Sequence, residues 1–343
     1  NILIVRFSSL KYIFLTGHHT LFMAALIAVV LTVAGLDGVL LYIVGGLGLG
    51  FAMAAFPALA QPYMQKITGN NDIALVHFST ITYVLSAEIG RLVGKDSKST
   101  EEMKFPKGLS FLRDSSISIA LTMLILFLIV TAVAGPAFLL SEFGIEQNFI
   151  IFALIQAITF AAGVYVVLQG VRMVIGEIVP AFKGFSEKIV PDAKPALDCP
   201  VVFPFAPTAV LIGFLASFIG GVIGMAVLIA IGANNVILPG VVPHFFVGAT
   251  AGVFANATGG RRGAILGAFA NGLAITFLPL LLFPVLGELG FANTTFGDGD
   301  FIAVGAIVGF LARYNVVLVS AVIVIAYVTP IILGLVKKEP AAA

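Results

Sequence analysis

Long apolar runs constrain this chain more than any other feature of its sequence. They cover roughly residues 12–36, 39–59, 116–140, 149–175, 207–232, 264–287 and 314–336. A helix needs about 20 apolar residues to cross the hydrocarbon core of a bilayer. The runs do not alternate apolar and polar residues as barrel strands do, so they predict helices. We therefore expect an all-α polytopic membrane protein.

The composition supports this class and excludes others. Hydrophobic residues make up 60% of the chain and charged residues only 10%, whereas soluble domains carry about 25% charged residues. Lipid must therefore cover most of the surface, as in a multi-pass protein of a bacterial inner (plasma) membrane. A net charge of +1 gives no reason to expect nucleic acid, and the single Cys199 excludes an internal disulfide. There is no P-loop, so we expect neither direct ATP use nor a cofactor.

Charges in the connecting segments predict the orientation. Lys and Arg concentrate in 91–115, in 176–197 and at the end of the chain. The segments 141–149 and 288–300 hold acidic residues without Lys or Arg, and Asp298 and Asp300 belong to the second of them. The positive-inside rule places the basic segments in the cytoplasm, as loops or amphipathic segments, and the acidic segments outside.

Two segments do not read as simple spans. Residues 61–90 begin and end near basic charges, and residues 235–260 are broken by Pro239, Gly240 and Pro243. Re-entrant hairpins or broken helices fit both segments better than full crossings. Irregular backbone at membrane depth persists only where protein or a water-filled cavity satisfies it.

The order of these features recurs in two halves of the chain, approximately 12–140 and 200–288. Paired broken segments in two halves indicate the binding site of an inverted-repeat transporter. The plainer alternative is two ordinary helix ends rich in Pro and Gly. An inverted repeat would place Arg261 and Arg262 outside, against the charge rule, so the sequence leaves their side open.

The histidines are the first candidates for a polar site. All four of them, His18, His19, His77 and His244, lie in or beside the suspected repeat segments. A charged side chain at membrane depth costs about 2.5–3.5 kcal/mol on insertion scales, so ionisable residues there indicate function. The plainer alternative for each is a neutral imidazole bonded to a backbone carbonyl. Their spacing is not that of a zinc site, so no metal is expected.

Asp198 is the clearest acidic candidate. It lies in PALDCPVVFPFAPTAVL, at the start of a deeply apolar stretch, where its carboxylate can accept hydrogen bonds from hydroxyl groups. The alternative is an N-cap at the membrane interface. Ser79, Thr80 and Thr208 can add neutral hydrogen bonds, although such side chains in helices often bond their own backbone.

Four segments together resemble one family. They are KYIFLTGHHTLFM, VHFSTITYVLSAEIGRLVGK, KSTEEMKFPKGLSFLRD and ALDCPVVFPFAPTAVLIGF. They resemble the ascorbate-specific IIC component of the bacterial phosphotransferase system, over about residues 5–336. Family members have several more N-terminal helices, so residues 1–343 are expected to be a single, N-terminally truncated IIC domain.

The resemblance implies a fold and a mechanism. Such proteins are homodimers, with a core domain that holds the solute and a V-shaped dimerisation domain. The core carries L-ascorbate inward in an elevator motion. A cytoplasmic IIB protein, itself phosphorylated on cysteine through a IIA protein, then phosphorylates the sugar acid. No catalytic residue is therefore expected within this chain.

The family's motif positions fall on particular residues here. The LTGH histidine matches His18, the histidine of the first hairpin matches His77, and the motif aspartate matches Asp198. The tip of the second hairpin matches 239–243, including Pro239 and Gly240. Together with these, the expected substrate-binding set includes His19, Ser79 and Thr208.

The expected mechanism follows from these matches. Asp198 and His77 would receive hydroxyls, His18 or His19 would help hold an enolate, and broken helix N-termini would favour an anion. Some relatives carry glutamine where this chain has Phe22 and Phe78, which weakens the expectation of identical contacts.

Two rival functions remain open from the sequence. An ion-coupled secondary permease would use Asp198 and the histidines as proton sites and would deliver unmodified solute. A related IIC component would carry a polyol such as galactitol. A structural membrane protein would leave the clustered polar breaks unexplained.

Overall fold

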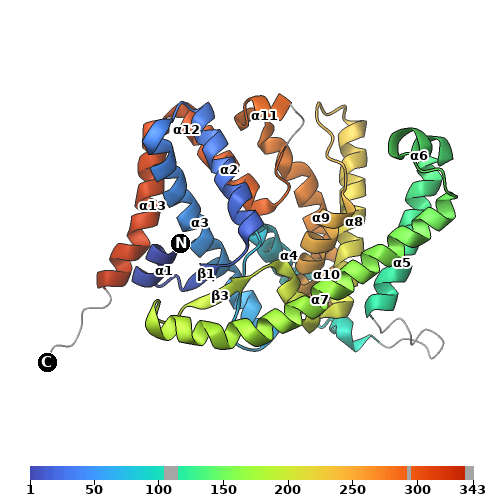
Figure 1. Ribbon diagram of the computed structural model, residues 1–343, viewed down its shortest axis with the longest axis horizontal. Coiled ribbons are helices and arrows are strands. Elements are labelled where there is room, and N and C mark those ends of the chain that lie inside the picture. The colour runs from blue at the N-terminus through green and yellow to red at the C-terminus, as the bar shows by residue number, and fades with distance from the viewer. Residues whose placement is uncertain (104–114, 292–294, 337–343) are drawn as a thin grey trace. The chain divides into compact units, whose positions relative to one another are not determined.

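The computed structural model describes residues 1–103, 115–291 and 295–336, and it is mostly helical (Figure 1). Within these residues, six helices are long and apolar enough to cross a membrane, which confirms the prediction of a polytopic membrane protein. Five basic residues used in the orientation argument, Lys104, Lys107, Arg113, Lys337 and Lys338, lie outside the described residues.

Most predicted spans contain a helix. The longer helices are α2 (Gly17–Val33), α3 (Gly38–Thr68), α5 (Ser115–Ala134), α7 (Phe149–Lys188), α8 (Pro207–Ala230), α10 (Ala249–Phe277), α12 (Gly299–Tyr314) and α13 (Val316–Val336). The shorter ones are α1 (Ile2–Phe7), α4 (Thr80–Val93), α6 (Pro136–Phe143), α9 (Val241–Pro243) and α11 (Glu288–Phe291).

The chain divides into two compact units, Asn1–Thr100 with Ile175–Ala343, and Glu101–Val174. The smaller unit contains α5, α6 and the first part of α7. The predicted span 116–140 is interrupted at Gly135, whose φ of 80° turns the chain from α5 into α6. Helix α7 continues to Lys188, so the first part of 176–197, which was expected to be a loop or an amphipathic segment, is helical.

A small parallel sheet in the larger unit was not expected from the sequence. Strands β1 (Tyr12–Phe14), β3 (Lys194–Leu197) and β2 (Ala74–Leu75) lie side by side in that order. Tyr12 pairs with Lys194, and Ala74 pairs with Ala196. The first residues of the apolar run 12–36 are therefore a strand, and the carboxyl ends of all three strands lie at the same edge.

The first interrupted segment is present, but it is shorter than predicted. Helix α3 continues through Pro57 and Pro62 to Thr68, and Gly69, with a φ of 74°, ends it. Irregular backbone and β2 then lead to α4, which begins at Thr80. Residues 69–79 are thus the break in the first half of the chain.

The second interrupted segment ends at the turn of a helical hairpin, whose second arm lies in the predicted span 264–287. Within α10, Gly259 and Gly260 leave the helical conformation, and the φ of Gly260 is 54°. A Cβ atom on Gly267 would lie 2.6 Å from the Cβ atom of Ala255. In a straight helix these positions would be about 18 Å apart along the axis. The chain therefore folds back at the two glycines.

Arg261 and Arg262 lie beside the basic segment 91–103. The backbone N–H of Arg261 donates to the Lys98 carbonyl at 2.8 Å, and that of Arg262 donates to Oγ of Ser97 at 3.2 Å. The Arg261 Nε–H also donates to the Ser99 carbonyl at 3.2 Å. Both arginines thus lie on the same side as the basic segment that the positive-inside rule predicts to be cytoplasmic.

The start of helix α12 corrects the prediction for the last two acidic residues of 288–300, Asp298 and Asp300. This segment was expected to be an acidic loop outside the membrane, but Asp300 is completely buried. Asp298 is the N-cap residue of α12, and only 20% of its side chain is exposed. The wrong placement arose because both carboxylates were read as surface charges, whereas they bond groups inside the protein.

Candidate functional site

The candidate site lies at the carboxyl edge of the small sheet. His18 and His19 follow β1 in the first turn of α2, His77 follows β2, and Asp198 follows β3. The hydroxyl of Thr16 donates to the Val76 carbonyl at 3.2 Å and ties the first two connections together. Parallel pairing therefore brings side chains from distant parts of the sequence to one place.

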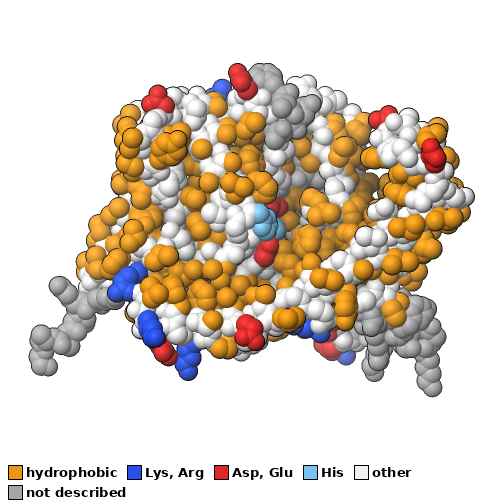
Figure 2. All heavy atoms as spheres, in the orientation of Figure 1, with side chains coloured by type: hydrophobic (Ala, Val, Ile, Leu, Met, Phe, Trp, Pro, Cys, Tyr) orange, Lys and Arg blue, Asp and Glu red, His pale blue; other side chains and the backbone are white. Residues whose placement is uncertain are grey.

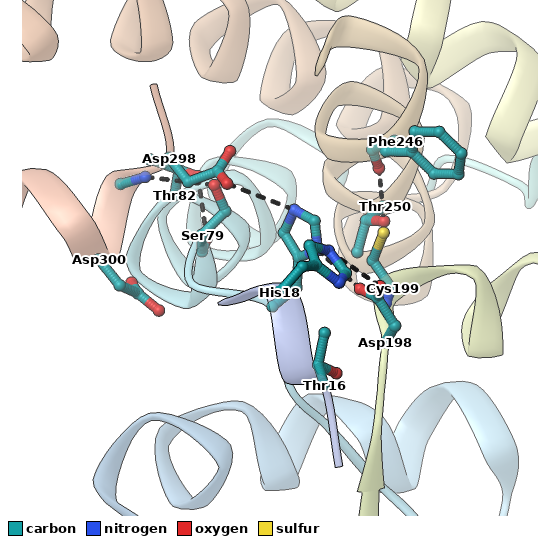
Figure 3. Close-up of polar contacts among 12 residues, drawn as sticks. Thr16, His18, Ser79, Thr82, Asp198, Cys199, Phe246, Thr250, Asp298 and Asp300 are labelled. Carbon is teal, nitrogen blue, oxygen red and sulfur yellow. Dashed lines mark hydrogen bonds and ion pairs between the residues drawn. The ribbon is translucent and has the colours of Figure 1, made fainter. Parts of the chain in front are cut away.

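Asp198 connects two of the histidines. Its Oδ1 lies 2.7 Å from Nδ1 of His77 and also accepts from the backbone N–H of Cys199 at 2.7 Å. Its Oδ2 lies 3.6 Å from Nε2 of His18 (Figure 3). The His18 side chain is 56% exposed and that of His77 only 8%. His18 therefore faces the open side of the site, and His77 forms its buried wall.

The three histidines form one contiguous group, called here the three-histidine cluster (His18, His19 and His77). The His19 ring lies 4.5 Å from the His18 ring and 4.0 Å from the His77 ring, between centroids. Phe301 stacks on His19 with a centroid distance of 5.6 Å. In Figure 2 a histidine with acidic side chains beside it stands out on a mainly hydrophobic face.

Asp298 is a site residue that the sequence reasoning missed. Its Oδ2 lies 3.7 Å from Nε2 of His77, whose other ring nitrogen contacts Asp198. His77 therefore lies between two carboxylates, one after β3 and one at the start of α12. The signal that could have identified Asp298 is the alternation Gly297-Asp298-Gly299-Asp300 directly before an apolar run.

Asp300 caps the helix that follows the first break. Its carboxylate accepts from the backbone N–H groups of Thr80 and Ile81, each at 2.8 Å. Its own N–H donates to the Phe78 carbonyl at 2.7 Å. The N-terminus of α4 is therefore already paired with a carboxylate, and its partial positive charge is met within the protein.

Ser79 lies beside the three-histidine cluster, and its hydroxyl helps to join the start of α4 to the start of α12. Oγ of Ser79 accepts from the backbone N–H of Gly299 at 3.2 Å, and the side chain is completely buried. Ser79 and Asp300 thus connect the start of α4 with the start of α12. The junction fixes His77 and Asp298 relative to each other.

We expect Asp300→Asn to destabilise the protein moderately. The asparagine amide retains one acceptor oxygen, so one of the two backbone N–H groups loses its partner. An unsatisfied buried donor costs about 1–3 kcal/mol. A lower thermal melting temperature in detergent would confirm the loss, with the exposed Asp96→Asn as the control. Equal melting of both variants would contradict the capping role.

The candidates of the second half lie in a separate polar group. Nδ1 of His244 lies 2.8 Å from Oγ of Ser217, which is 3.4 Å from Oδ1 of Asn271. All three side chains are buried. Pro239 and His244 both pack against Gly221 of α8, and Gly240 follows in the same irregular segment. Thr208 lies in the first turn of α8 and is half-buried.

The structure thus brings His18, His19, His77, Ser79 and Asp198 together at one edge of the sheet. It places Pro239 and Gly240 with His244 in the second polar group. The first group also contains potential metal-ligand sets, one of which is His19, His77 and Asp298.

Comparison with known families decides the class of this protein. Residues 1–300 match the family described as "PTS system sugar-specific permease component" (EIIC-GAT). This chain belongs to that family. The permease thus shares its family with phosphotransferase-system components, in agreement with the resemblance seen in its sequence.

One relative of the chain has a description that names a particular solute. Over 252 residues the permease is 29% identical to the "Ascorbate-specific PTS system EIIC component" of Mycoplasma pneumoniae (strain ATCC 29342 / M129 / Subtype 1). The aligned region covers 66% of this chain and 38% of the relative. The chain therefore spans well under half of the relative's length.

Proposed function

We propose that the permease binds L-ascorbate at the three-histidine cluster and carries it inward, coupled to phosphorylation by a phosphorylated IIB protein. The observation that carries this proposal is the position of His77 between Asp198 and Asp298, next to the exposed His18. Imidazoles and carboxylates together supply the donors and acceptors that a hydroxylated ring requires. The ascorbate-specific relative supports this choice of solute.

Each group at the edge of the cluster has a distinct role in the proposal. Oδ2 of Asp198 lies toward the exposed His18 and accepts a solute hydroxyl. His18 donates from its ring to the enolate oxygen. His19, Phe78 and Phe301 form a buried wall behind them, since their rings pack at centroid distances of 5.4–6.0 Å. A wall that excludes water lowers the local dielectric constant and so strengthens the hydrogen bonds beside it.

The phosphoryl group is proposed to come from the partner protein. Cys199 is the sole cysteine of the chain, and it is 1% exposed. A buried thiol cannot meet a donor protein in the cytoplasm, which supports IIB, supplied by IIA, as the phosphoryl donor. A homodimer with a moving core and a V-shaped dimerisation domain belongs to the same proposal.

We expect Asp198→Asn to lower ascorbate uptake and binding about tenfold or more. The change removes a charged acceptor, and hydrogen bonds to charged groups contribute about 1.5–3 kcal/mol. Uptake of labelled ascorbate into cells that contain IIA and IIB measures the effect. Asp192→Asn is the matched control, because Asp192 is exposed and its φ of 62° suits asparagine. Unchanged binding and uptake in Asp198→Asn would refute this site.

The same assay separates the rival functions. An ion-coupled permease would accumulate unmodified ascorbate without phosphoenolpyruvate or IIB, whereas the proposed function yields a phosphorylated product. A polyol-specific component would be recognised by competition, because galactitol and not ascorbate would then displace the bound solute.

A further inference from the structure

We propose that His19, His77 and Asp298 form a binding site for a divalent transition-metal ion such as Zn²⁺, with Asp198 orienting His77 from the other side. The ion site is inferred from the contacts of these four side chains. It does not depend on the identity of the transported solute.

The separations between the ligand atoms suit one small ion. One ring nitrogen of His19, one of His77 and one oxygen of Asp298 all lie within 4.8 Å of one another. Nε2 of His77 and Oδ2 of Asp298 are 3.7 Å apart. Ligands at about 2.0–2.2 Å from a tetrahedral zinc ion are roughly 3.4 Å apart. The observed 3.7 Å is close to that value and is too long for a direct hydrogen bond.

One ring nitrogen of each proposed histidine ligand lacks a partner in the part of the chain that the structure describes. Nδ1 of His19 and Nε2 of His77 are both fully buried and accept or donate no hydrogen bond there. Taken as whole residues, His19 is 3% exposed and His77 is 7% exposed. A buried polar atom without a partner costs about 1–3 kcal/mol, so such atoms indicate a ligand.

Asp198 gives His77 the arrangement found behind metal-bound histidines. Nδ1 of His77 lies 2.7 Å from Oδ1 of Asp198. A proton on Nδ1 leaves a lone pair on Nε2, which is the nitrogen that faces Asp298. Metal-ligating histidines usually donate their second ring N–H to a carboxylate, which fixes the tautomer and raises the basicity of the ligand. In the neutral ring, that lone pair would face a carboxylate oxygen unless a cation lay between them.

The charge balance of the cluster also favours a cation. In the described residues, the ion pairs of Asp198 and Asp298 are made to histidines, with no Lys or Arg among them. Two imidazoles and a carboxylate are ligands that zinc accepts, and a three-ligand set leaves a coordination position open. If the proposed function is correct, an enolate oxygen of the solute can take that position.

Metal binding to the purified protein in detergent tests the proposal. The protein is stripped with EDTA and dialysed, and Zn²⁺ binding is then measured by calorimetry and by elemental analysis after desalting. We expect one ion per chain in the wild type. Asp198→Asn should weaken binding about 10–100-fold through loss of the orienting hydrogen bond. His19→Gln and Asp298→Asn, which remove ligands, should weaken it further.

Controls separate loss of a ligand from loss of the fold. His244→Gln changes a buried histidine in the second polar group and should bind Zn²⁺ as the wild type does. Thermal melting and gel filtration of each variant report whether it is folded. No retained ion in the wild type, or equal binding in the wild type, His19→Gln and Asp298→Asn, would overturn the metal site.

The ion site and the proposed function fail in different ways. Ascorbate binding by protein that binds no Zn²⁺ would overturn the ion site and leave the proposed function intact. Zn²⁺ binding that depends on His19 and Asp298, without any ascorbate binding, would support the ion site and contradict the proposed solute.

Discussion

Replacing His77 by alanine should abolish measurable solute binding and strongly destabilise the permease. His77 lies between Asp198 and Asp298, at 2.7 and 3.7 Å, and its side chain is 8% exposed. Its removal leaves two carboxylates facing each other across a cavity. A carboxylate that loses its hydrogen-bonding partner costs more than the about 1–3 kcal/mol of a neutral unsatisfied group. Equilibrium binding of labelled ascorbate and thermal melting in detergent measure the two effects.

His244→Ala is the matched control for this prediction. It also removes a buried imidazole, but the partner of His244 is the neutral hydroxyl of Ser217, at 2.8 Å. A smaller loss of stability, about 1–3 kcal/mol, is expected, and solute binding should persist. If His77→Ala does not fold, His77→Gln keeps a donor toward Asp198 and allows binding to be measured. Wild-type affinity in either His77 variant would contradict the assignment.

The membrane class and most spans could be predicted because long apolar runs have few structural solutions. The small sheet could not. Strands β1, β2 and β3 contain three, two and four residues, and each is set by pairing with segments far away in the chain. Tyr12–Phe14 carries the same apolar character as the helix that follows, so periodicity gave no reason to separate them.

The sequence pointed to most residues of the candidate site but not to its geometry. The resemblance to a family pointed to His18, His77 and Asp198, yet His77 and Asp198 are 121 residues apart and meet only because their strands are parallel neighbours. Asp298 and Asp300 were misplaced because the orientation rule counts Lys and Arg and says little about acidic residues. Their burial depends on amide and imidazole partners that no local pattern reveals.

The hairpin within α10 is a further feature that could be predicted only in part from the sequence. The sequence analysis placed the tip of the second hairpin at 239–243, but the chain folds back at Gly259 and Gly260, where the positive φ of Gly260 explains why glycine is needed. The sequence could not indicate which elements pack against the turn. In the structure, the turn packs against the end of α4 and against Ser97 and Lys98.

Gly94→Ala is therefore expected to prevent stable packing of α4 on the α10 hairpin. A Cβ atom on Gly94 would lie 2.1 Å from Cα of Gly259, and one on Gly259 would lie 2.0 Å from the Gly90 carbonyl oxygen. Overpacking of side chains costs about 1–3 kcal/mol, because rotamers can adjust. Here the obstructing atoms are backbone, so one helix must move away from the other, and we expect a larger loss.

The measurement is the yield and melting temperature of folded protein in detergent, with Gly46→Ala as the matched control. Gly46 lies within α3, is exposed, and has no atom within 4 Å of an added Cβ. Alanine should even favour that helix by about 0.5–1 kcal/mol. Because both variants add one methyl group to a glycine, a difference between them isolates the contact at the turn.

Equal melting of Gly94→Ala and Gly46→Ala would show that the α4–α10 contact tolerates separation. Helix α4 begins at Thr80, three residues after His77. Such tolerance would therefore also mean that the position of His77 depends on Asp300 and the sheet and not on the α4–α10 contact.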